Sequence, residues 1–129
     1  MGKPTCPTEF EEQAFVIQWS RMMAATGQDP RLALLHGDSS GVRVPIGCAV
    51  KMRRAGSIKG FPDLFLPVGQ RYPVPYNGLF LELKRLVGGT VSPEQKAIHD
   101  ALREQGYKVV VAKGADAAIR EIKNYLGMP

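Results

Sequence analysis

Hydrophobic side chains recur along the first half of the chain in patterns that predict two helices and one strand. Residues 8–25 begin with Thr8, a favourable N-cap, and carry large apolar side chains at helical spacing. Residues 32–36 form a short apolar run that predicts a strand. Residues 45–55 predict a second helix, with Pro45 in its first turn.

The second half of the chain predicts three strands and two helices. The strands are residues 63–67, 78–84 and 108–113, and the helices are residues 92–105 and 115–126. Ser92 is the expected N-cap of the first of these helices, and Pro93 stands at its first helical position. A loop with two closely spaced prolines separates the first two strands.

This order of elements predicts an α/β sandwich, in which helices flank a mixed central β-sheet. The helix 92–105 joins two strands as a parallel crossover, so the strand 78–84 is expected at the centre of the sheet. At 129 residues the chain is long enough for one domain. We therefore expect a single domain over residues 1–129, with its core at about residues 8–126.

Composition and segment lengths narrow the class of protein. The chain is 44% hydrophobic and 22% charged, as is usual for a globular protein. No apolar run approaches the roughly 20 residues of a membrane span, and the first residues lack the apolar segment of a signal peptide. We expect a cytoplasmic protein with no membrane partner. Cys6 and Cys48 stand far apart, so they indicate neither a disulfide framework nor a zinc site.

Basic residues are concentrated in one window of the chain. The net charge is +5, and no acidic residue lies between Asp38 and Asp63. The basic residues of that window are Arg43, Lys51, Arg53, Arg54 and Lys59. Two interpretations remain: a basic face turned to solvent, or a surface that contacts the phosphates of a nucleic acid.

Three charged residues stand at the ends of two apolar strands. Asp63 opens the strand 63–67, while Glu82 and Lys84 share one face of the strand 78–84. Each has an ordinary structural explanation, a turn residue for Asp63 and an ion pair for the other two. If the strands are antiparallel neighbours, however, all three converge. Two carboxylates are suitable ligands for Mg²⁺ or Mn²⁺, and a nearby lysine suits the hydrolysis of a phosphate ester.

The motifs "FPDLF" and "LELKR", around Asp63 and Glu82, resemble those of the PD-(D/E)xK nuclease superfamily. The segments "TEFEEQAFVIQW", "GSIKGFPDLFLP", "GLFLELK" and "SPEQKAIHDALREQGYKVVVAKGADAAI", in this order, are similar to the VRR-NUC (virus-type replication-repair nuclease) branch. The resemblance covers most of the chain and implies a restriction-endonuclease-like fold.

The resemblance also implies roles for individual residues. Asp63 and Glu82 are the implied metal ligands, the Leu83 carbonyl is a possible further ligand, and Lys84 is the implied catalytic lysine. Gln95 matches a glutamine near the metal site in the family. In the first helix, Glu9 and Gln13 match a glutamate and a glutamine of the family. Glu12 is the alternative to Glu9.

Other residues are candidates for contact with the substrate. His36 stands where related sequences usually have an asparagine, and it is either a substrate contact, a base or a bystander. The candidate nucleic-acid-binding residues are Lys51, Arg53, Arg54, Lys59 and Arg85. Phe15 and Trp19 are expected in the core. Tyr72 and Tyr76 are expected in a loop next to the site, where they would be better placed to stack on bases, although packing within the loop is the favoured interpretation. Gly60 and Pro62 would let the backbone turn and leave room for a phosphate.

We expect, from this resemblance, a Mg²⁺- or Mn²⁺-dependent DNA endonuclease that selects junctions or flaps by their structure. Family members without further domains resemble junction resolvases, which implies a homodimer. Such a compact form suits a phage or a prokaryote. The alternatives are a DNA-binding module that keeps the fold without catalysis, and a metal-dependent phosphatase or small-molecule hydrolase.

Overall fold

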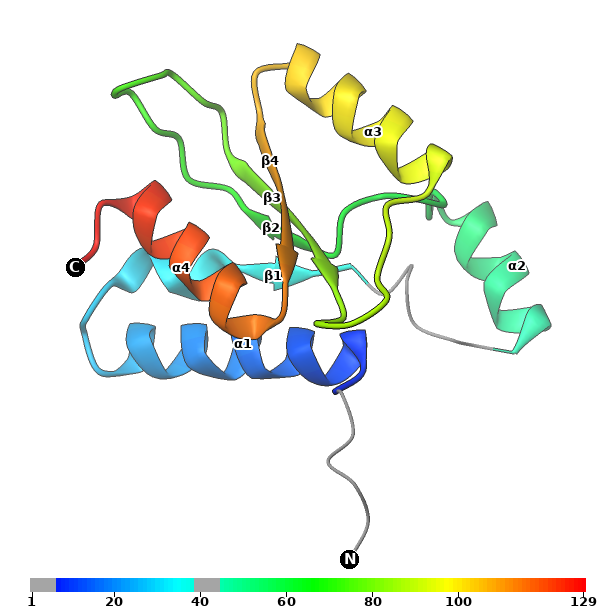
Figure 1. Ribbon diagram of the computed structural model, residues 1–129, viewed down its shortest axis with the longest axis horizontal. Helices are drawn as coiled ribbons and strands as arrows, with labels where there is room; N and C mark the ends of the chain where they lie inside the picture. The colour runs from blue at the N-terminus through cyan, green and yellow to red at the C-terminus, as the bar shows by residue number, and fades with distance from the viewer. Residues whose placement is uncertain (1–6, 39–44) are drawn as a thin grey trace, which may run out of the picture.

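The computed structural model describes residues 7–38 and 45–129. Helices and strands are interspersed along the chain (Figure 1). The elements are α1 (Glu9–Ala25), the 3₁₀ helix η1 (Pro30–Leu34), β1 (His36–Gly37), α2 (Ile46–Arg54), β2 (Leu64–Leu66), β3 (Leu79–Lys84), α3 (Pro93–Glu104), β4 (Lys108–Lys113) and α4 (Ala115–Leu126). Within these residues, no helix combines the length and the apolar character that crossing a membrane requires.

The four strands form one mixed sheet in the order β1-β2-β3-β4. β1 pairs with β2 and β2 with β3 in antiparallel fashion, whereas β3 and β4 are parallel. The α/β class and the central position of the strand predicted at 78–84 are therefore confirmed. The helix α3 connects the parallel pair, as expected for a crossover.

Alternation along β3 divides the two faces of the sheet. The leucines of β2 and β3 belong to the main core, together with Val16 of α1 and both Ala118 and Ile122 of α4. These leucines are Leu64, Leu66, Leu79, Leu81 and Leu83, and all are fully buried. The residues between them point to the opposite face, which α3 partly covers. That second face carries the polar groups discussed below.

The predicted strand at 32–36 is wrong, because most of these residues belong to the 3₁₀ helix η1. The side chain of Asp29 accepts a hydrogen bond from the backbone N–H of Arg31, and Pro30 occupies the first helical position. Leu32 and Leu35 are both fully buried and three residues apart, which suits a helix of three residues per turn. Of the predicted strand, only His36 is part of β1.

The expectation that Phe15 belongs to the core is also wrong. Its side chain is 55% exposed, and α1 instead buries Glu12, Val16 and Ser20, which recur every four residues. Trp19 does pack against the core, as predicted. Apolar residues are spread around α1, so the sequence pattern did not single out the face that contacts the sheet.

The loop with Tyr72 and Tyr76 is not next to the predicted site. It joins the end of β2 to the start of β3, whereas Asp63 and Lys84 lie at the start of β2 and the end of β3. Figure 1 shows this green connection extending away from the rest of the sheet. Tyr76 packs near Tyr125 of α4, with 6.5 Å between the ring centroids. The order of the strands along the chain already places this loop at the end of the sheet opposite Asp63 and Lys84.

Candidate active site

Asp63, Glu82 and Lys84 lie together at one end of the sheet. Leu64 pairs with Leu81 in the antiparallel ladder, so Asp63, one residue earlier, lies beside Glu82, one residue later. All three side chains are buried, with exposed fractions of 7%, 1% and 5%. The backbone N–H of Leu83 donates a hydrogen bond of 2.7 Å to Oδ2 of Asp63. The convergence expected from the sequence is therefore present.

The environment of Glu82 opposes its ionisation. Burial, then a hydrogen bond to Asp63 and the charge of that residue, raise the pKa of Glu82 from its ordinary 4.5 to about 9. The charge of Lys84 acts in the opposite direction, and the charge of Glu9 adds to the rise. The carboxyl group of Glu82 therefore retains its proton at neutral pH when no cation is bound. A cation that binds both carboxyl groups would replace this proton.

The first turn of α3 holds the lysine in place. Nζ of Lys84 donates a hydrogen bond of 2.8 Å to Oε1 of Gln95, and the same oxygen accepts a bond of 2.9 Å from the backbone N–H of Ser92. Oγ of Ser92 in turn accepts from the backbone N–H of Gln95, which completes a capping box. One cap therefore both starts the helix and positions the ammonium group.

Gly60 allows α3 to lie this close to the site. Its φ of +88° is unfavourable for other residues, and a Cβ atom there would lie 2.9 Å from the backbone N of Gln95. The space beside Gly60 is thus filled by the first turn of α3. The expectation that Gly60 leaves room for a phosphate is wrong, because its role is to admit the helix.

His99 contacts Glu82 directly, and the sequence pattern did not identify it. Nε2 of His99 lies 3.0 Å from Oε1 of Glu82, and both side chains are almost completely buried. Burial, followed by the positive charges of Arg103 and Lys84, lowers the pKa of His99. Its ring is therefore neutral at neutral pH. The tautomer of the ring decides whether His99 or Glu82 donates the hydrogen bond between them. The available signal was its position four residues after Gln95, on the same helical face.

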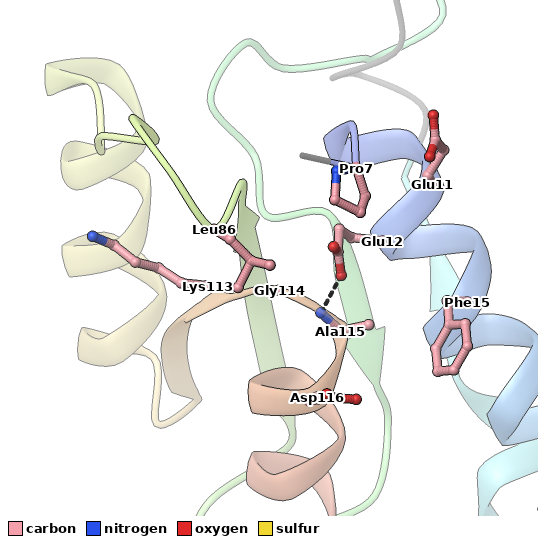
Figure 2. A pocket seen from close by; sticks show the side chains of 9 residues that line it. All are labelled: Pro7, Glu11, Glu12, Phe15, Leu86, Lys113, Gly114, Ala115 and Asp116. Carbon is pink, nitrogen blue, oxygen red and sulfur yellow. Dashed lines mark hydrogen bonds between the residues drawn. The ribbon is translucent and has the colours of Figure 1, made fainter. Parts of the chain in front are cut away.

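The two candidate glutamates of α1 have different surroundings. Glu9 is half-buried and close enough to Glu82 to raise its pKa. Glu12 is buried elsewhere: Oε2 accepts a hydrogen bond from the backbone N–H of Ala115, at the first turn of α4. Figure 2 shows this contact in a hollow of about 400 Å³ between the start of α1 and the start of α4. Glu12 therefore acts as the cap that α4 lacks at Gly114.

Gln13 and His36 lie close to β1. The side-chain amide of Gln13 packs so closely against Gly37 that a Cβ atom there would displace it. His36 is exposed, and its ring meets the edge of Phe65 at a centroid distance of 5.8 Å. Phe65 pairs with Phe80, two residues before Glu82 on the same face of β3. His36 thus lies beside an aromatic pair that adjoins the carboxyl groups.

The candidate nucleic-acid-binding residues are exposed. None of the residues of α2 is buried, and the helix stands at the outer side of the molecule (Figure 1). Lys51, Arg53 and Arg54 occupy its last turns, and Lys59 follows it. Arg85 is exposed directly after β3. Arg43 lies outside the described residues.

The residues of this site offer few ligands for a metal ion. Within residues 7–38 and 45–129, no group of three or more His, Cys, Asp or Glu side chains is arranged to hold a metal ion. The site instead offers two adjacent carboxyl groups and backbone oxygens. Hard divalent ions such as Mg²⁺ accept such a set, since they bind one or two carboxylates and keep several waters.

Comparisons with known proteins agree with this fold and point to one family. The family model of the VRR-NUC domain matches residues 42–116, more than half of the chain. A solved structure described as a VRR_NUC domain protein matches with a TM-score of 0.75 and 29% sequence identity. The match covers 97% of this chain and 93% of that one. No curated protein matches the sequence.

Proposed function

We propose, from the premise that this chain belongs to the VRR-NUC family of nucleases, that it is a metal-dependent endonuclease that hydrolyses phosphodiester bonds in DNA. The observation that carries this proposal is the buried group of Asp63, Glu82 and Lys84. Burying three ionisable side chains at one end of the sheet is costly for folding, and such groups are typical of functional sites.

The carboxyl groups fit a divalent cation. Asp63 and Glu82 would hold Mg²⁺ or Mn²⁺, and the carbonyl of Leu83 is the natural third donor. The N–H of Leu83 points to Asp63, and the carbonyl of a strand residue points to the same side as its N–H. A bound ion would supply Lewis-acid polarisation of the phosphoryl oxygen and a hydroxide at neutral pH. It would also keep both carboxyl groups ionised despite the raised pKa of Glu82.

Lys84 and Gln95 would act on the phosphate and the attacking water. The Lys84 ammonium group lies two residues beyond Glu82 on the same face and is held by Gln95. From this position it offsets the negative charge that develops on the phosphate. Gln95 orients Lys84, and Glu9 adds a negative charge at the edge of the site. The exposed basic residues of α2, with Lys59 and Arg85, would contact the DNA backbone.

A cleavage assay with matched lysine variants tests this function. Wild type, Lys84→Met and Lys113→Met are incubated with labelled four-way junction, flap and linear duplex, in Mg²⁺, in Mn²⁺ and in EDTA. Lys113 is a suitable control because it pairs with Lys84 on the neighbouring strand and is exposed. We expect cleavage by wild type and Lys113→Met with either metal, and none by Lys84→Met or in EDTA. Equal cleavage by all three proteins would contradict the proposed role of Lys84.

The substrate panel also tests two finer proposals. No base-reading motif is evident in the sequence, so we propose that the enzyme selects branched DNA by its shape, and junctions or flaps should be cleaved faster than linear duplex. We also propose a homodimer, whose two sites would address two strands. The exposed apolar side chains of Phe15 and Leu86, beside the hollow in Figure 2, offer surface for contact with a second copy. Sedimentation equilibrium should give twice the chain mass.

The alternative is a DNA-binding module without catalysis. It predicts salt-dependent binding of DNA but no cleavage by wild type under any of these conditions. The intact Asp63, Glu82 and Lys84 favour the nuclease, because a module that only binds DNA has no need to bury them. A metal-dependent phosphatase, in contrast, predicts no affinity for DNA, which a gel shift at two salt concentrations distinguishes.

A further inference from the structure

An aromatic pocket adjoins the carboxyl groups on the same face of the sheet. It is about 210 Å³ in volume. Its lining residues are His36, Asp38, Phe61, Pro62, Phe65 and Phe80. Phe65 and Phe80 stack on each other at a centroid distance of 4.2 Å, and Phe61 meets Phe80 edge to face at 5.5 Å. Phe61 and Phe65 are only half-buried, so part of their surface faces the pocket.

The strand register fixes where this pocket lies relative to the site. Phe65 pairs with His36 on one side and with Phe80 on the other, so the three rings form one row across β1, β2 and β3. The next row carries Asp63, two residues before Phe65, and Glu82, two residues after Phe80. Two residues of a strand span about 7 Å. This is comparable with the reach of one nucleotide from its phosphate to its base.

We propose that this pocket binds one unpaired nucleobase of the strand whose phosphate lies at Asp63 and Glu82. The inference rests on the proposed function, and it adds that the substrate presents a single-stranded nucleotide beside the cleaved bond. A flap or a single strand provides such a nucleotide, whereas an intact duplex does not.

The chemistry of the pocket suits a base. Aromatic rings stack on the flat faces of all four bases, and the exposed His36 offers a polar group to the edge of a base. The volume is below the roughly 300–1,000 Å³ of pockets that hold drug-sized molecules, so a single ring system fits better than a base pair. The position of the pocket, one row from the carboxyl groups, favours a base that belongs to the substrate itself.

The first test measures binding by fluorescence anisotropy in EDTA, where no cleavage interferes. The probes are a labelled single strand and a strand of the same length in which every nucleotide is abasic. Both carry the same phosphates, so they differ only in the bases. We expect wild type to bind the strand with bases about 5- to 100-fold more tightly. Equal affinity for the two strands would overturn the proposal without any variant.

Variants then locate the preference for bases. Phe65→Leu and His36→Ala should lower the ratio of the affinity for the strand with bases to the affinity for the abasic strand. Because His36 is exposed, its replacement should leave the fold intact. Tyr72→Leu is the matched control, because Tyr72 is 84% exposed on the loop at the opposite end of the sheet. It should keep the wild-type ratio. The proposal is wrong if Phe65→Leu and His36→Ala also keep it.

The two proposals fail in different ways. An affinity ratio that does not depend on the pocket residues contradicts the base site and leaves the nuclease untouched. Absence of metal-dependent cleavage by wild type contradicts the nuclease, whatever the affinity ratio. Thermal unfolding of each variant, followed by circular dichroism, shows whether a lowered ratio reflects an unfolded protein instead of the missing side chain.

Discussion

The raised pKa of Glu82 has a measurable effect on stability in the absence of metal. In the unfolded chain this side chain ionises near pH 4.5, whereas in the folded protein burial and Asp63 raise its pKa to about 9. The folded state therefore binds one more proton than the unfolded state between these values. The stabilisation from this proton is complete below pH 4.5 and is lost as the pH rises toward 9.

The size of the effect follows from proton linkage. Each pH unit between the two pKa values lowers the free energy of unfolding by about 1.4 kcal/mol through this group. Between pH 5 and pH 7 the loss is about 3 kcal/mol. Glu82→Gln has no proton to lose, so its stability should exceed that of wild type by an amount that grows by about 3 kcal/mol over this range.

Urea denaturation at pH 5, 6, 7 and 8, in EDTA, measures this difference. Glu104→Gln is the control for loss of a carboxyl group at the surface, because Glu104 is exposed at the end of α3. Its stability should follow that of wild type at each pH. If the difference between Glu82→Gln and wild type is the same at all four pH values, the assigned environment of Glu82 is wrong.

Three further predictions concern the residues around the site. His99→Ala should weaken Mn²⁺ binding by about 10- to 100-fold in calorimetry without DNA, because outer partners of metal ligands typically contribute that much. Gly60→Ala should lower the free energy of unfolding by about 1–3 kcal/mol in urea, through its positive φ and the close approach of α3. Replacing Lys51 and Arg54 with glutamine should make duplex binding less sensitive to salt. In a plot of the logarithm of the binding constant against the logarithm of the salt concentration, the slope should become shallower by about 0.9 for each phosphate that is no longer neutralised.

Much of the fold was predictable because its signals are local. The strand at 108–113 and the helix at 115–126 match β4 and α4 residue for residue, since an apolar run and an amphipathic pattern mark them clearly. Ser92 and Pro93 likewise fixed the start of α3. The segment from residue 32 to 36 failed because its three-residue period became visible only once the core was known.

The site was predictable in part for a similar reason. Asp63, Glu82 and Lys84 are recognisable because charged residues are unusual in apolar strands. His99 was missed because a histidine on a helix has many ordinary explanations, and only the tertiary packing of α3 on β3 brings it to Glu82. The different surroundings of Glu9 and Glu12 also depend on tertiary structure. Both stand in the first turns of α1, but only Glu12 accepts a hydrogen bond from the start of α4.

The claim that Asp63 and Glu82 together hold the divalent ion needed for DNA hydrolysis is tested most directly by a Mn²⁺ titration. Wild type, Asp63→Asn and the control Asp116→Asn, which alters an exposed carboxylate, are titrated by calorimetry, and junction cleavage is measured on the same samples. We predict that wild type and Asp116→Asn bind Mn²⁺ and cleave, whereas Asp63→Asn does neither. Undiminished Mn²⁺ binding and cleavage by Asp63→Asn would contradict the claim.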